Sequence, residues 1–222
     1  MNVKALLTTA LVVIGVWIRL PEAQAAMQPP VATPGAMASV EDVPQRAAPA
    51  GLGAVALPVD ESGIAALFER LPATIAGEER AEDAVGGDDD RLVVAYGADF
   101  AGLGPPLAIQ AIDLTSGDFW PADWTAELVV LALASGADWS VDGVGRDGDL
   151  VWIRWQTVAS IADDRTSTPA VSRTLYSVNW GRIGEPWLFG AAADTPERLD
   201  AVIAAFVNAA AADSGTPEAT PS

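Results

Sequence analysis

The hydrophobic pattern predicts an amphipathic helix at the start of one compact block, residues 59–211. Four apolar side chains recur there at helical spacing and define one buried face. They are Ile64, Leu67, Phe68 and Leu71. Asp60 or Ser62 can cap the first turn, and Pro72 ends the helix.

Two further helices are predicted, one in the middle of the block and one at its end. The middle helix spans 122–135, is strongly apolar and is followed by Gly136 as a C-terminal cap. The last helix reads "TPERLDAVIAAFVNAA", with Thr195 as its N-cap and Pro196 as its first residue. Its core stripe consists of Leu199, Val202, Phe206 and Val207.

Short β-rich runs fill the space between these helices and predict the strands. They read "RLVVAYG", "PPLAIQAIDL", "DWSVDGVG", "DLVWIRWQTVASI", "AVSRTLYSVNWG" and "EPWLFGAAA", with "TIAGEERAE" as a further short strand. The predicted order is α-β-β-β-α-β-β-β-β-α. Adjacent strands with tight turns favour an antiparallel sheet, so we expect an α+β domain of about six to seven strands and three helices.

The first 25 residues have the three-part pattern of a secretory signal. Lys4 precedes an uncharged, mostly apolar run at 5–18, and Pro21 follows before a predicted cleavage site after Ala25. The apolar run is short for a membrane-spanning helix. We therefore expect an exported, extracytoplasmic protein, with an uncleaved N-terminal membrane anchor as the alternative.

The rest of the chain divides by composition. Residues 26–58 are rich in Ala, Pro, Val and Gly without a sustained period, which is typical of a flexible linker. Residues 59–211 form the single α+β domain, and 212–222 read as a Pro/Thr/Ser tail. The sequence contains no internal repeat.

Charge and residue types exclude several functions. The formal net charge of −18 disfavours binding to nucleic acid or to an anionic membrane surface. The chain has no Cys and no His, and its single Lys is Lys4 within the predicted signal. Thiolate, imidazole and Schiff-base chemistry are therefore excluded in the mature chain, as are the usual His/Cys metal sites. We expect no cofactor, no resident metal and no enzymatic activity.

The acidic stretch "VDGVGRDGDL" admits two interpretations. Asp142, Asp147 and Asp149 suggest a calcium loop, but their spacing and the lack of a closing Glu do not match an EF-hand. Asp147 and Gly148 at the centre of "RDGD" instead predict a two-residue hairpin turn. The acidic run at 86–91 is interpreted as a solvated loop.

Two adjacent strands carry the candidate binding surface. Trp152 and Arg154 share one face of their strand, whereas Trp155 faces the opposite way and is assigned to the core. If the next strand pairs suitably, the joint surface would contain Trp152, Arg154, Arg173, Ser177 and Asn179. The alternative is a helix layer over that face, or an Arg154 that packs its stem and pairs with an acid.

The segments "LPATIAGEER", "VVAYG" and "LAIQAIDL", followed by "ADTPERLDAVIAAF", give the chain a family resemblance. In element order it resembles small exported bacterial domains of the PsbP-like α/β/α sandwich type, over about 75–193 and the last helix. The resemblance implies an antiparallel sheet between helices and a non-catalytic accessory or binding role. It carries over no catalytic residue.

Three functions follow as expectations. The first is an exported, non-catalytic domain that binds a protein or small ligand. The second is a glycosidase-like hydrolase that uses paired carboxylates on an extracellular polysaccharide. The third is a purely structural, envelope-associated protein without a ligand.

Overall fold

The computed structural model describes residues 44–81, 91–100, 103–113, 139–162 and 169–212. This part of the chain forms one six-stranded sheet, one two-stranded ribbon, a short 3-10 helix and two α-helices. The prediction of an α+β domain with an antiparallel sheet is confirmed. Two of the three predicted helices are present in the described part, and the predicted helix 122–135 lies outside it.

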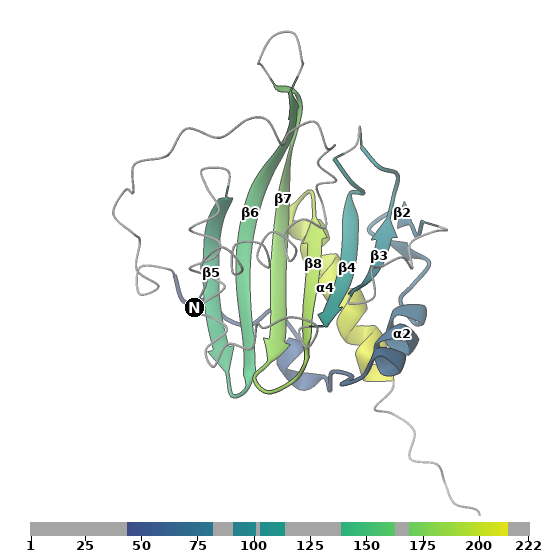
Figure 1. Cartoon of the computed structure of the whole chain (residues 1–222), viewed down its shortest axis with the longest axis vertical. Coiled ribbons are helices and arrows are strands. Elements are labelled where there is room, and N and C mark those ends of the chain that lie inside the picture. The colour runs from purple at the N-terminus through teal and green to yellow at the C-terminus, as the bar shows by residue number, and fades with distance from the viewer. Residues whose placement is uncertain (1–43, 82–90, 101–102, 114–138, 163–168, 213–222) are drawn as a thin grey trace, which may run out of the picture.

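The elements follow one another in the order that the hydrophobic pattern indicates. They are η3 (Leu52–Ala54), α2 (Glu61–Glu69), β1 (Thr74–Ile75), β2 (Glu78–Glu79), β3 (Arg91–Tyr96), β4 (Leu107–Asp113), β5 (Trp139–Asp147), β6 (Leu150–Ala162), β7 (Pro169–Arg182), β8 (Trp187–Ala193) and α4 (Pro196–Ala211). The large sheet has the strand order β3-β4-β8-β7-β6-β5, and every neighbouring pair is antiparallel (Figure 1). β1 and β2 pair separately as a small hairpin rather than as one strand.

Both described α-helices begin at the predicted caps. The Asp60 carboxylate accepts a hydrogen bond from the backbone N–H of Gly63 at 2.7 Å, and this bond holds the pKa of Asp60 below its ordinary value. In α4 the Thr195 hydroxyl accepts from the backbone N–H of Arg198 at 3.3 Å, and Pro196 opens the helix.

The main core lies where α4 and α2 pack on one face of the sheet. α4 crosses β8, β4 and β7, and Figure 1 shows it behind the sheet, with α2 next to its end. Trp180, Phe189 and Phe206 form the aromatic centre of this layer, with ring centroids 5.0–6.1 Å apart. All three are fully buried, so this cluster is a main source of the hydrophobic stabilisation of the fold.

The folded domain begins before the expected boundary at residue 59. Leu52, Val55 and Leu57 are 0%, 5% and 7% exposed and belong to the main core. The interpretation of 26–58 as a flexible linker is therefore wrong for its last part. Isolated apolar residues in an Ala/Pro-rich stretch have no period, so their burial is not visible in the pattern.

The opposite face of the sheet is buried as well. Its side chains include Ala108, Ile112, Val151, Ile153, Leu175, Leu188 and Ala192, each at most 4% exposed. Both faces of the sheet are thus interior surfaces, which explains the continuous apolar runs in β4 and β8.

The predicted hairpin between β5 and β6 is confirmed, with a turn shifted by one residue. Asp147 pairs with Leu150, so Gly148 and Asp149 form the loop. Of these two turn residues, only Gly148 has a positive φ, at 62°. This fits a turn that needs glycine at its first central position. The Asp149 carboxylate pairs with Arg182 at 2.6 Å, and thereby ties this hairpin to the end of β7.

Glu185, at the neighbouring turn, is expected to weaken the fold at neutral pH. Burial raises the pKa of its carboxyl above the ordinary value, Arg182 opposes this shift and Asp149 adds to it. An acid with a raised pKa stabilises the folded state below its unfolded pKa, and this advantage is lost as the pH rises through the folded pKa. The Glu185→Gln variant is therefore expected to melt at a higher temperature than the wild type at pH 7. This gain should vanish near pH 4; equal gains at both pH values in thermal unfolding would contradict it.

Candidate functional site

The strand register separates the five residues of the predicted binding surface. Trp152 lies opposite Trp180 and Arg154 lies opposite Val178, which places the first two candidates on the face that α4 covers. Arg173, Ser177 and Asn179 lie on the other face of β7. The five residues therefore form no joint surface, and that prediction is wrong because it paired the two strands with the wrong faces together.

Both tryptophans of the "VWIRW" stretch are interior residues. Trp152 is 3% exposed and belongs to the main core, so it offers no platform to a ligand. Trp155 is 9% exposed on the opposite face, and its indole N–H donates to the Asn179 side-chain oxygen at 2.6 Å. The prediction that Trp155 is an interior residue is confirmed. The prediction that Trp152 is part of an accessible binding surface is wrong, because Trp152 is buried as well.

Arg154 reaches the edge of α4 and opens onto a groove of about 660 Å³. The segment 46–50, β5, β6 and α4 form its walls. Arg154 is 29% exposed and lies 3.9 Å from the Asp200 carboxylate, a loose ion pair. Its guanidinium Nε is buried and makes no hydrogen bond. A buried N–H without an acceptor is costly, so Arg154 has unused capacity for hydrogen bonding.

Charges of both signs line the same groove. Arg46 and Asp142 stand at its mouth, 52% and 59% exposed, and pair at 3.5 Å. Asp200, on α4, is 68% exposed. Arg46 and Asp200 were not among the sequence-predicted residues, because Arg46 lies in the presumed linker and Asp200 reads as an ordinary outward-facing helix residue. The volume of the groove falls in the range of small-ligand sites.

A row of uncharged polar side chains lies inside the opposite face of the sheet. Gln110, Ser177 and Asn179 are 5%, 4% and 5% exposed, close to the Trp155 indole. The side-chain oxygens of Gln110 and Ser177 have no hydrogen-bond partner. The space between these groups is only about 10 Å³, the size of one water molecule. This space is too small for an organic ligand.

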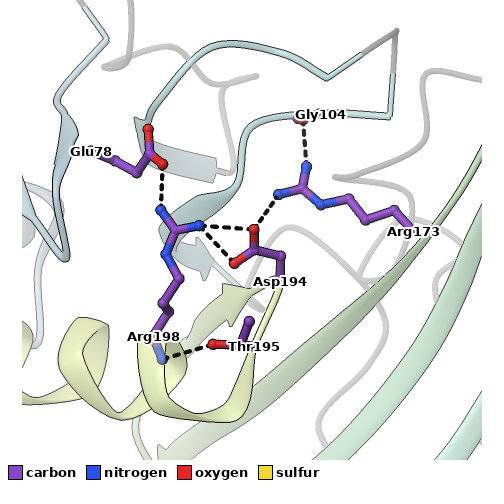
Figure 2. Close-up of polar contacts among 6 residues, drawn as sticks. All are labelled: Glu78, Gly104, Arg173, Asp194, Thr195 and Arg198. Carbon is purple, nitrogen blue, oxygen red and sulfur yellow. Dashed lines mark hydrogen bonds and ion pairs between the residues drawn. The ribbon is translucent and has the colours of Figure 1, made fainter.

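Arg173 belongs to an ion-pair network at the start of α4. Its guanidinium donates to the Gly104 carbonyl at 3.0 Å and lies 3.4 Å from the Asp194 carboxylate. Arg198 binds the same carboxylate with one amino group and Glu78 with the other, as Figure 2 shows. The network joins β2, β7, the loop at Gly104 and the β8–α4 junction.

This network positions the fold and does not resemble a hydrolytic centre. A glycosidase needs two carboxylates that face each other across an open cleft. Glu78 and Asp194 instead share one guanidinium, which lies between them (Figure 2). Their geometry therefore lends no support to the glycosidase-like alternative.

A second groove of about 570 Å³ lies on the other side of α4. Small helix residues form much of its wall, among them Ala201, Ala205 and Ala209, with Arg70 at its rim. The Arg70 guanidinium donates a hydrogen bond to the Ala209 carbonyl at 3.2 Å, so it already has a partner within the protein. This groove therefore has few polar groups that could orient a ligand.

The acidic positions around the β5–β6 turn gather no metal-binding group. Across the described residues, no set of three Asp or Glu side chains could hold a metal ion. Asp149 pairs with Arg182, and Asp142 pairs with Arg46. Within the same part of the chain, no helix is long and apolar enough to cross a membrane.

Comparison of the chain with protein-family models, with curated proteins and with solved structures found no match. The groove around Arg154 is thus the candidate site on the strength of its own geometry.

Proposed function

We propose that this protein is an exported, non-catalytic binding domain whose groove between α4 and the β5–β6 edge takes a short peptide with charges of both signs. The observation that carries the proposal is Arg154, which lines the groove, forms only a loose ion pair with Asp200 and has an Nε donor without a hydrogen-bond partner. A carboxylate is the acceptor that a guanidinium binds best, because two parallel N–H groups match its two oxygens.

The rim of the groove supports a ligand that also carries positive charge. Asp142 and Asp200 are each more than half exposed, so they can receive a basic side chain or an amino terminus. A purely anionic ligand would meet a chain with a net charge of −18 and be repelled at long range. A peptide that presents an acidic group to Arg154 and a basic group to the rim meets both conditions.

Export and the PsbP-like likeness complete the proposal. The N-terminal signal pattern motivates the extracytoplasmic location, and the helix expected at 122–135 would be the third helix of the sandwich. A binding domain in such a family needs no reactive side chains, in keeping with a mature chain free of Cys, His and Lys. The purely structural alternative has no particular observation in its favour.

The Arg154→Gln variant is expected to bind such peptides about ten- to hundredfold more weakly than the wild type. A hydrogen bond to a charged group contributes about 1.5–3 kcal/mol, which corresponds to that range of affinity. The measurement uses the full-length protein on an immobilised array of random hexapeptides. The wild type should select sequences with an acidic residue.

The matched control is Arg146→Gln on β5, a solvent-exposed arginine whose guanidinium donates to the Gly148 carbonyl and which does not line the groove. This variant should select the same peptides as the wild type. Loss of selection in both variants, or in neither, would contradict the assignment of the site to Arg154.

A further inference from the structure

The outer edge of β5, which no other strand of the sheet pairs with, is bridged by a short segment from the N-terminal side of the same chain. β5 is the last strand of the sheet, and Gln45 forms a parallel bridge to Val144 on its outer edge. The N–H of Arg46 donates to the Val144 carbonyl at 2.8 Å, and the N–H of Val144 donates to the Pro44 carbonyl at 3.0 Å. We call Pro44–Arg46 the strap.

The edge of β5 is shaped to let a backbone approach closely. Gly143 and Gly145 flank Val144, and a Cβ atom on either would collide with Arg46. At Gly143 the Cβ would overlap Cγ of Arg46. At Gly145 it would overlap the Trp152 indole first and would also lie 2.6 Å from the Arg46 carbonyl oxygen. Gly143 therefore makes a slot for the extended segment, whereas Gly145 makes room for both the Trp152 indole and the segment.

A β-bulge adds a side-chain contact to this slot. The register of β5 against β6 shifts between Val141 and Gly143, so Asp142 is the extra residue and is exposed at the edge. The Arg46 guanidinium donates to the Asp142 carbonyl at 3.3 Å and pairs with its carboxylate at 3.5 Å. The slot thus recognises both an extended backbone and an arginine side chain.

We propose that this edge of β5 is a docking site for an extended, arginine-bearing segment of a partner chain, for which the strap is the resident substitute. Pairing to a sheet edge is a common mode of peptide recognition. The strap bridges one residue of β5, whereas the strand extends over Trp139–Asp147. A longer partner segment can therefore form more pairs than the strap does. This edge adjoins the groove of Arg154 and shares Arg46 and Asp142 with it, but backbone pairing to β5 does not require Arg154.

The test uses a labelled, capped peptide with the sequence of residues 43–48 and measures its fluorescence anisotropy with the full-length protein. The Arg46→Pro variant removes the strap's N–H donor and its guanidinium while leaving β5 unchanged. It should bind the peptide at least about tenfold more tightly than the wild type, where the tethered strap competes at high effective concentration. The same peptide with Gln in place of its Arg should bind several-fold more weakly.

Two second-site changes in the Arg46→Pro background locate the docking site. Gly143→Val should abolish peptide binding, because its side chain fills the slot. Asp142→Asn, at an exposed position that leaves the core untouched, should weaken binding several-fold and serves if Gly143→Val does not fold by circular dichroism. A folded Arg46→Pro variant that binds no better than the wild type would overturn the proposal, as would unchanged affinity in the folded second-site variants. Because Arg46 and Asp142 also line the groove, Arg154→Gln is added to the Arg46→Pro background and should leave binding of this peptide unchanged. Loss of binding in that variant would assign the peptide to the groove and overturn docking at the edge of β5.

Discussion

Replacing Trp180 with alanine is expected to lower the free energy of unfolding by about 3–5 kcal/mol, a large share of the total stability of an ordinary domain. Trp180 is fully buried between Phe189 and Phe206. The opposite residue on β6, Trp152, belongs to the same core and cannot fill the space, because its own position is set by strand pairing. The change therefore removes apolar burial and leaves a cavity at the centre of the main layer.

Urea denaturation followed by circular dichroism measures this loss. The matched control is Val158→Ala on β6, since Val158 is 46% exposed and its truncation should change the free energy by less than about 0.5 kcal/mol. A loss below about 1 kcal/mol for Trp180→Ala would show that the aromatic cluster is not the centre of the core.

Adding a single methyl group at Gly190 is expected to destabilise the protein by about 1–3 kcal/mol. A Cβ at this position would lie 2.7 Å from the Asn179 amide nitrogen and 2.8 Å from the Gln110 amide nitrogen. Both side chains are buried, and Asn179 accepts from the Trp155 indole, so neither can move aside without breaking the polar row. The cost arises from crowding and from displaced hydrogen bonds together.

Gly53→Ala separates this crowding from the general effect of replacing glycine. The nearest atom to a Cβ at Gly53 is the Asp147 carboxylate at 3.6 Å, an ordinary contact, and its φ is not positive. That variant should be neutral or slightly stabilising, because alanine restricts the unfolded chain. Equal unfolding free energies for Gly190→Ala and Gly53→Ala would contradict the packing described for the polar row.

Local signals in the sequence carried most of the element predictions. The caps at Asp60 and Thr195 and the apolar spacing that follows them define α2 and α4 through short-range geometry alone. The hairpin around Gly148 is likewise local, although the turn uses Gly148–Asp149 rather than Asp147–Gly148. Such features depend on a few neighbouring residues, so a single sequence is sufficient to find them.

The faces of the strands could not be assigned in the same way. Alternation of apolar and polar residues marks the inner face of a sheet only where the other face meets water. Here Trp152 and Trp155 point to opposite sides and both are buried. The pairing of Trp152 with Trp180, which fixes the faces, is a long-range fact about register.

The candidate site was found only in part for the same reason. Arg154 was selected as a rare cation beside an aromatic residue, and it does line the groove. Its partners in the groove are contributed by distant segments, Arg46 before the first helix and Asp200 on the last. Gly143 was the one local hint of the strap, because a glycine within a strand can mark the close approach of another backbone.

The proposed binding of a peptide at Arg154 is tested most directly by an NMR titration of the full-length, ¹⁵N-labelled protein with a hexapeptide selected on the array. We expect the Nε–H resonance of Arg154 to shift, together with the backbone amides of Ile203 and Ala204 in the groove wall. The amides of Ala108 and Ala192, on the opposite face of the sheet, should stay unchanged. Shifts at Ala108 and Ala192 with none at Arg154 would contradict the groove as the binding site.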